Sequence, residues 1–383
     1  MPASEPGCSE GCHAGHRRNA DKRCGAAPEN QRAFRSHSTT QHLCRQKHMT
    51  SLSLLRGPSN GLGKGVILSY HRIASRAPDP WGLRVTEAVF AEQMAALRTI
   101  AEPVTLQKLA TGHRSCDGRP VVAVTFDDGY NDNLSRALPH LLMQNVPATV
   151  FVSTAYTGRR HFWWDVMEQV FLTPGSLPLQ LALQHSGQRF SWLLGPAANY
   201  SESQYAADSR AFRWGGEPET RIRLYFDVHE ALWSFPVEAR MDLAEDILAW
   251  SGFAPEGSEV TRPLTAAELV RLASHELISI GSHTVSHPAL DTLPPPCQRA
   301  EILGNRAFLE ELTGRPVDTF AYPHGRHSDE SLRVLREAGF SAACTTRVAA
   351  AHPGCDPLLL PRLAVKNWTA TEFVARLTEV LEA

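Results

Sequence analysis

The sequence predicts an α/β fold built on a parallel sheet, and three features of its pattern carry that prediction. From residue 66 onward, short runs rich in Val, Ile and Phe alternate with amphipathic segments of helical period. Several of these runs are apolar throughout, as expected of strands that are covered on both faces. About seven strand and helix units follow one another, so the sheet could close into a barrel. Catalytic side chains are then expected just after the strand ends.

The composition is that of a folded globular protein. Of the 383 residues, 43% are hydrophobic and 20% are charged, and 38 basic residues against 40 acidic ones give a net charge of -2. This balance provides no electrostatic attraction for nucleic acid, which we therefore do not expect as a partner. No apolar run approaches the roughly 18 residues that a transmembrane helix needs.

Residues 1–63 show neither strand nor helix periodicity, and we expect them to be a disordered extension, with Met49 as a possible alternative start. Neither start is followed by an apolar stretch as long as that of a secretory signal. The cysteines beyond the extension are scattered, which suits free thiols in a reducing compartment. The sequence therefore predicts a cytoplasmic protein.

A single domain is expected over residues 64–383. Its predicted strands are Val66–His71, Val121–Phe126, Ala148–Val152, Leu277–Ser282, Thr319–Tyr322, Ser341–Thr345 and Leu358–Val365. Helices with one apolar stripe are expected over Thr86–Ile100, Ser328–Gly339, and from about Thr371. Residues 154–263 interrupt the alternation with a segment rich in Trp, Gly, Pro and Ser, and we expect an insertion or lid that includes a helix over Val237–Trp250.

Two of the predicted strands end in groups that suit a divalent cation. Asp127 and Asp128 follow the second strand, and two adjacent carboxylates raise each other's pKa unless a cation lies nearby. His283 and His287 follow the fourth strand, and imidazoles four residues apart can face one ion. Alone, an Asp pair can be a turn or helix-cap signal. Together, two imidazoles and one carboxylate predict a metal site with open coordination positions, as in catalytic centres.

At these residues the chain resembles the polysaccharide deacetylases, the NodB-homology domain of carbohydrate esterase family 4. The resemblance rests on Thr125-Phe126-Asp127-Asp128-Gly129 and His283-Thr284-Val285-Ser286-His287. Two further motifs resemble the exopolysaccharide or poly-N-acetylglucosamine branch, namely Tyr70-His71-Arg72-Ile73 and Phe162-Trp163-Trp164-Asp165. The resemblance covers residues 64–383 without most of the insertion. It implies a distorted (β/α)7 barrel.

The resemblance also implies a hydrolase that removes N-acetyl groups from an oligosaccharide or polysaccharide, so an N-acetylated glycan is the implied partner. Asp128, His283 and His287 would hold a divalent metal, most simply Zn²⁺, with Ni²⁺, Co²⁺, Fe²⁺ and Mn²⁺ as alternatives. Asp127 would act as the general base. The chemistry agrees, because a bound divalent ion lowers the pKa of its water to about 7, and a neighbouring carboxylate can then take the proton.

The chain departs from the family pattern in two places. Family members often have Arg-x-Pro-Tyr-Gly where this chain has Ala321-Tyr322-Pro323-His324-Gly325, so the arginine that orients the base is missing. A Leu-x-Leu-x-His motif that supplies the general acid is replaced by Leu358-Leu359-Leu360-Pro361-Arg362. We expect His71, which ends the first strand, to act as the acid, although a structural histidine is the alternative. Arg362 could replace the missing arginine by pairing with Asp127.

The predicted substrate contacts are Tyr130, Trp164, Asp165, Tyr322 and Arg362, although tryptophans of the insertion could equally pack the scaffold. Thr284 or Ser286 is expected to hydrogen-bond to its own loop and fix the imidazoles. Two other functions stay open: hydrolysis of a non-sugar amide such as a cyclic imide or ureide, and glycan binding without turnover. The intact set of metal ligands argues against the second of these.

Overall fold

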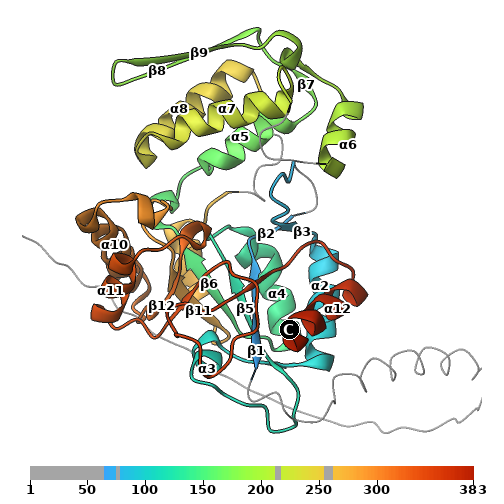
Figure 1. Ribbon diagram of the computed structural model, residues 1–383, viewed down its shortest axis with the longest axis vertical. Coiled ribbons are helices and arrows are strands. Elements are labelled where there is room, and N and C mark those ends of the chain that lie inside the picture. Colours follow the sequence, from blue (N-terminus) through green and yellow to red (C-terminus); the bar gives the residue numbers. More distant parts are fainter. Residues whose placement is uncertain (1–63, 75–77, 212–216, 254–261) are drawn as a thin grey trace, which may run out of the picture. The chain divides into compact units, whose positions relative to one another are not determined.

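The computed structural model describes residues 64–74, 78–211, 217–253 and 262–383. The predicted disordered extension, residues 1–63, lies outside the described residues. Within the described ranges, the main sheet follows the order β13-β12-β11-β6-β5-β1-β14 and all its pairings are parallel (Figure 1). Its strands are β1 (Gly65–Tyr70), β5 (Val121–Phe126), β6 (Ala148–Val152), β11 (Ile278–Ser282), β12 (Thr319–Ala321), β13 (Ala342–Cys344) and β14 (Leu363–Ala364), and β4 (Glu102–Pro103) pairs beside β5.

A closing segment, residues 357–364, joins the two edges of this sheet. The Leu360 N–H donates to the Ala343 carbonyl of β13 at 2.8 Å. Further along the segment, Leu363 pairs with Leu68 of β1. The strands therefore form a distorted (β/α)7 barrel, which confirms the predicted fold. The last strand is shorter than expected because proline at 361, which has no N–H, interrupts its ladder.

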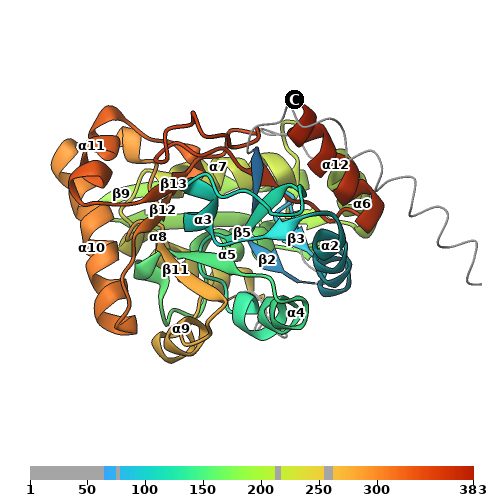
Figure 2. The same cartoon turned by 90° about the horizontal axis from the view of Figure 1, so that it is seen from below.

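Helices surround the barrel, as Figure 2 shows from below. They are α2 (Glu87–Ile100), α3 (Leu106–Ala110), α4 (Leu138–Gln144), α9 (Ala266–Ala273), α10 (Pro295–Thr313), α11 (Asp329–Glu337) and α12 (Ala370–Glu382). The predicted helices are confirmed, and Thr86 and Ser328 cap α2 and α11 by accepting hydrogen bonds from backbone N–H groups. Phe90 and Leu97 of α2 are buried in the same apolar cluster as the strands. None of the described helices combines the length and apolar composition that a membrane span requires.

Short elements connect the barrel units near the strand ends. They are β2 (Arg72–Ile73), β3 (Arg84–Val85), η1 (Asn133–Ala137), η2 (Thr154–Tyr156), η5 (Leu290–Thr292) and η6 (Pro323–Gly325). Because β2, η2 and η6 each begin two residues after a strand of the main sheet, they set the directions of the side chains at the rim where parallel strands end.

The insertion has an apolar core of its own. Its helices are α5 (Trp163–Leu172), α6 (Glu202–Ala211), α7 (Arg221–Trp233) and α8 (Val237–Ser251), and its remaining elements are β7 (Gly175–Ser176), β8 (Gln180–His185), β9 (Gln188–Leu193), η3 (Gly195–Ala198) and β10 (Asn199–Tyr200). Figure 1 shows the β8–β9 hairpin on the side of these helices that faces away from the barrel. Tyr130, which follows β5, is buried in the same cluster as Phe171 and Tyr225 of the insertion. The insertion is therefore packed onto the rim of the barrel.

Candidate active site

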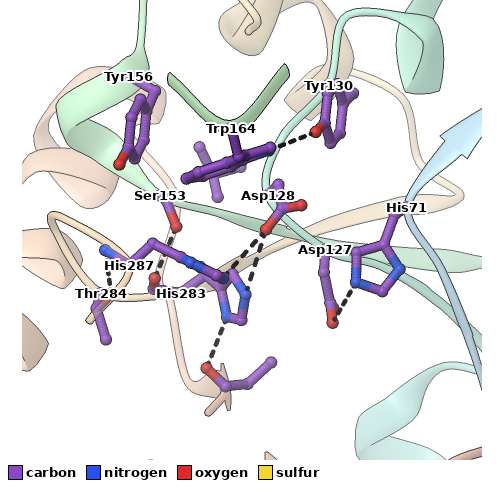
Figure 3. Close-up of polar contacts among 12 residues, drawn as sticks. His71, Asp127, Asp128, Tyr130, Ser153, Tyr156, Trp164, His283, Thr284 and His287 are labelled. Atoms are coloured by element: carbon purple, nitrogen blue, oxygen red, sulfur yellow. Dashed lines mark hydrogen bonds and ion pairs between the residues drawn. The ribbon is translucent and has the colours of Figure 1, made fainter. Parts of the chain in front are cut away.

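The ends of β5 and β11 bring Asp128, His283 and His287 together (Figure 3). Asp128 Oδ1 lies 3.6 Å from His283 Nε2 and 3.4 Å from His287 Nε2. This carboxylate oxygen is buried and has no hydrogen-bond partner among the described residues. Because a buried carboxylate oxygen without a donor is costly, and the three ligand atoms lie within 4.8 Å of one another, the group fits a divalent cation. Burial, followed by the charge of Asp127, raises the pKa of Asp128 when no cation is bound.

The backbone at this group is strained. Asp128, Thr284 and His287 have φ angles of 72°, 66° and 59°, in the left-handed region that side chains with a Cβ rarely adopt. Asn305 of α10 links the end of β6 to the loop that follows β11. Its side-chain amide donates to the carbonyl of Val152, at 2.9 Å, and to that of Thr284. Strain of this kind persists where the surrounding structure enforces it, and it is commonest at functional sites.

Hydrogen bonds orient the His283 imidazole and hold the loop that carries His287. His283 Nδ1 lies 2.7 Å from the carbonyl oxygen of Ala321, so it carries the proton and leaves the lone pair of Nε2 toward Asp128. The backbone N–H of His287 donates to Thr284 Oγ1 at 3.0 Å, and the backbone N–H of Ser286 donates to the Glu301 carboxylate at 2.8 Å. The predicted hydrogen bond within the loop is therefore found at Thr284, whereas Ser286 ties the loop to Glu301 of α10. Burial lowers the pKa of each imidazole, which favours the neutral form that binds metals.

Asp127 is held by two parallel hydrogen bonds from Arg362. Nη1 lies 2.7 Å from Oδ1 and Nη2 lies 2.8 Å from Oδ2, and both side chains are buried. Burial alone would raise the pKa of Asp127, but the Arg362 guanidinium, helped by His283 and His71, holds it well below its usual range. The predicted replacement of the missing arginine is thus confirmed in geometry. Its two terminal nitrogens are engaged by Asp127, which is the geometry of a positioning residue. Arg362 also lines the cavity described below, so its contact with substrate stays a prediction.

His71 follows β1 and lies beside the same carboxylate. Its Nε2 is 3.7 Å from Asp127 Oδ2, and 19% of its side chain is exposed, toward the cavity (Figure 3). Burial lowers the pKa of His71 to about 4, although the charge of Asp127 acts in the opposite direction. The ring is therefore neutral near pH 7 before substrate binds.

These groups open into a cavity of about 660 Å³, which is within the size range of small-molecule sites. Trp164 and Tyr322, two of the predicted substrate contacts, line it. Tyr130 and Asp165 are not among the lining residues, and each is engaged in the buried hydrogen bonds that follow. Asp165 accepts hydrogen bonds from Arg72 at 2.5 Å and from the Tyr130 hydroxyl at 3.1 Å. The structure therefore corrects the prediction that Tyr130 and Asp165 contact the substrate directly.

Instead, Asp165 and Tyr130 belong to a buried network that supports Trp164. Arg72 also binds Glu168, with its Nη2 2.9 Å from Oε2. The Trp164 Nε1–H donates to the Tyr130 hydroxyl at 2.8 Å, and the Trp164 ring lies 5.2 Å from the ring of His287. The two motifs that contain Arg72 and Asp165 thus meet behind the cavity. Together they hold the Trp164 ring beside the potential metal ligands.

Several lining residues were not predicted from the sequence. They are imidazoles and indoles, and the cavity includes Trp81, His229, Trp233 and His324. The sequence does contain a signal for His324, because this histidine occupies the position of the tyrosine in the Arg-x-Pro-Tyr-Gly motif. For Trp81 and Trp233 the sequence offered only a general richness in tryptophan, with no periodicity that would direct them to one cavity.

The part of the chain that carries this site is similar to known proteins. The family model described as polysaccharide deacetylase matches residues 114–174 and 252–343, which contain the paired aspartates and both histidines. The Bacillus subtilis protein YxkH, named for the same family, is 31% identical over 102 residues, or 27% of this chain and 36% of its own length. The poly-beta-1,6-N-acetyl-D-glucosamine N-deacetylase of Escherichia coli K12 is 31% identical over 118 residues, or 30% of this chain and 17% of its own length.

The matched regions thus span little more than a third of these relatives, or less. A crystal structure of a polysaccharide deacetylase from Bacillus cereus superposes with a TM-score of 0.50 at 16% identity, covering 82% of this chain and 69% of that one. This likeness shows a common fold.

Proposed function

The chain belongs to the polysaccharide deacetylase family, and from this premise we propose that it is a metal-dependent hydrolase that removes N-acetyl groups from an oligosaccharide or polysaccharide. The proposal rests on one observation above all. An ionised carboxylate, Asp127, lies next to a set of three potential metal ligands at the bottom of a cavity. This arrangement suits hydrolysis of an amide, here a carbon–nitrogen bond other than a peptide bond.

Asp128, His283 and His287 would hold the metal. Two nitrogens and one oxygen fit Zn²⁺ best, and they also accommodate Ni²⁺, Co²⁺, Fe²⁺ or Mn²⁺. A divalent ion bound there would polarise the acetamide carbonyl and lower the pKa of a water molecule to about 7. The rest of the chemistry falls to side chains of the chain itself.

Asp127 takes the proton of the attacking water. Both of its oxygens accept a hydrogen bond from Arg362, and each keeps a further lone pair for that proton. Because Arg362 keeps the carboxylate ionised, the base is available across the physiological pH range.

His71 is the proposed proton donor to the departing nitrogen. Negative charge that develops on the substrate next to the ring raises the pKa of His71. The ring can then take the proton that Asp127 removed from the water, because His71 Nε2 lies 3.7 Å from Asp127 Oδ2, and pass it to the nitrogen.

An N-acetylated glycan is the proposed substrate. The cavity is walled by aromatic rings, which suit the apolar faces of sugar rings. The name of the Escherichia coli relative specifies poly-β-1,6-N-acetylglucosamine. We therefore place glycans of the exopolysaccharide or chitooligosaccharide type first among the substrates to be tried.

An acetate-release assay tests this function. N-acetylglucosamine oligomers with β-1,4 and β-1,6 linkages are incubated with protein that has been treated with a chelator and then resupplied with single metals. We expect release to vanish on chelation and to return with Zn²⁺ or another of the named ions. Ring opening of cyclic imides or ureides, with no acetate released from any sugar, would favour the alternative amide hydrolase, and glycan binding without acetate release would indicate an inactive homologue.

A further inference from the structure

The loop from His283 to His287 positions both imidazoles of the potential metal group, because only three residues separate them. Its backbone is strained, since Thr284 has a φ of 66° and His287 a φ of 59°. Left-handed angles at residues with a Cβ cost free energy, and they persist only where the surrounding structure enforces them. The hydrogen bonds that other segments make to this loop therefore determine where the two imidazoles lie.

The segment that follows β6 makes the first set of these bonds. Four of its groups donate to the four successive backbone carbonyls of residues 283–286, namely Ser153 Oγ to His283 at 2.8 Å, the Thr154 N–H to Thr284 at 3.4 Å, the Ala155 N–H to Val285 at 2.9 Å and the Tyr156 hydroxyl to Ser286 at 3.4 Å. These bonds reach carbonyl oxygens alone. They leave the donor groups of Ser286 to a different element.

That element is α10, which reaches the loop through Glu301. The backbone N–H of Ser286 donates to Glu301 Oε2 at 2.8 Å, and the Ser286 hydroxyl donates to Oε1 at 2.5 Å. One carboxylate thus accepts two bonds from the residue directly before His287. Because both donors belong to the same residue, the pair of bonds fixes the orientation of that residue as well as its position.

Asn305 lies about one helical turn from Glu301 and reaches the same loop. Its side chain is buried, and its Nδ2 donates to the Thr284 carbonyl, to the Val152 carbonyl at 2.9 Å and to Thr154 Oγ1 at 3.2 Å. Carbonyl oxygens can only accept hydrogen bonds, so they require a donor at this position. An aspartate would have the same shape and would not supply that donor.

We propose that Glu301 and Asn305 form a clamp on α10 that positions His283 and His287 for the metal. Neither member of this α10 clamp lines the cavity, so both are positioning residues. The clamp holds the loop in its strained conformation before an ion arrives, so that the backbone need not rearrange when the ion binds. This inference rests on the proposed function and deepens it, because it assigns the metal affinity of the proposed enzyme to residues that touch neither metal nor substrate.

Metal affinities of Glu301 variants test the clamp. Glu301→Leu removes both acceptors and should weaken Zn²⁺ binding by about 10- to 100-fold, as for other residues that support metal ligands. Glu301→Gln should keep most of the affinity, because its amide oxygen still accepts from the Ser286 N–H and its amide N–H can donate to the Ser286 hydroxyl. Titration against a chromophoric chelator measures both. Glu311→Leu is the control, since it makes the same change at an exposed position of α10 and should leave the affinity unchanged.

Cobalt spectra separate positioning from a loss of stability. The visible absorption of bound Co²⁺ depends on the geometry of its ligands. Glu301→Leu and Asn305→Asp should therefore change this spectrum at saturating metal, whereas a variant that is merely less stable keeps the wild-type spectrum in its folded fraction. Ser286→Ala removes only the hydroxyl bond and should weaken Zn²⁺ binding about two- to tenfold, so it carries the test if Glu301→Leu does not fold.

The outcomes that would overturn the clamp are specific. One is wild-type affinity or a wild-type cobalt spectrum in Glu301→Leu, or wild-type affinity in Ser286→Ala if Glu301→Leu does not fold. Another is a loss in Glu301→Gln as large as that in Glu301→Leu, since hydrogen bonds would then not be what positions the loop. Metal binding needs no substrate, so a wild type that binds Zn²⁺ and releases no acetate contradicts the proposed function alone. A wild type that binds no divalent ion would overturn the clamp, which would have no metal to serve.

Discussion

Within the described residues, two buried arginines donate short hydrogen bonds to carboxylates, one at the candidate active site and one between the barrel and the insertion. Arg362 binds one carboxylate, that of Asp127, through two nearly equal hydrogen bonds. Arg72 is shared by Asp165 and Glu168, and Arg84 adds only a contact at 3.6 Å to Glu168. Both sites are almost inaccessible to water, so their difference comes from how many carboxylates each cation serves.

The pKa of Asp127 is shifted down, whereas the pKa values of Asp165 and Glu168 are shifted up. Burial raises the pKa of Asp165 and of Glu168, and the shared Arg72 offsets only part of that effect. At Asp127 burial acts in the same direction, but a guanidinium of its own reverses the outcome and lowers the pKa. One cation for each carboxylate keeps a base ready for chemistry, whereas a shared cation gives a rigid support for Trp164.

The largest expected effect is on turnover at Asp127. Asp127→Asn removes the proposed base, and acetate release should fall by about 10²- to 10⁴-fold. The metal content should stay at the wild-type level because Asp128, His283 and His287 are untouched. Measurement of both on the same preparation decides the matter: full activity would remove Asp127 from the reaction, and loss of metal would make it a ligand.

Stability should depend most on the shared arginine. Arg72→Met leaves two buried carboxylates with only the distant Arg84, so the free energy of unfolding should fall by about 3–5 kcal/mol in urea titrations. Arg84→Met is the control, and its longer contact predicts a smaller loss. Comparable losses from both variants would contradict the central place given to Arg72 in the network.

Arg362→Met addresses the base itself. Without the guanidinium, burial raises the pKa of Asp127, and the carboxylate becomes protonated at a higher pH than in the wild type. Activity needs the ionised form, so the acidic limb of the kcat/KM profile should move up by about 1–3 pH units. An unchanged limb would show that another group controls it.

A smaller effect is expected at Asp132, close to the shared arginine. Burial raises the pKa of Asp132 to about 7. Between about pH 4, where an unfolded chain ionises, and pH 7, the folded protein keeps the proton and its stability falls as the pH rises. Asn cannot ionise, so Asp132→Asn should gain stability relative to the wild type by about 1 kcal/mol or more between pH 5 and pH 8. Melting curves at both pH values measure this, with exposed Asp242→Asn as the control.

The parts of the site that the sequence predicts are those tied to parallel strands. Because the carboxyl ends of such strands meet at one rim, the sequence alone predicts that Asp128 and His283 lie close together, although they are far apart along the chain. The pairing of Arg362 with Asp127 was predicted differently, from the arginine that the family pattern has and this chain lacks, and Arg362 lies directly before β14.

Helix geometry and strained turns explain what was missed. Trp164 and Asp165 are neighbours in α5, and consecutive helical residues point about 100° apart, so one faces the cavity while the other faces Arg72. The order of residues in the motif does not by itself show that Trp164 faces the cavity and Asp165 faces Arg72. His324 depends on a left-handed turn, and Trp233 depends on the packing of the insertion, and neither has a periodicity that the sequence displays.

The closing segment that completes the barrel also carries Arg362. A nascent polypeptide therefore has both aspartates long before it has the guanidinium that neutralises one of them. Until residues 357–364 dock between β13 and β1, the two acids lie side by side without that counter-charge. Completion of the barrel and pairing of the base with its counter-charge are thus one event, and a product truncated before this segment would lack both.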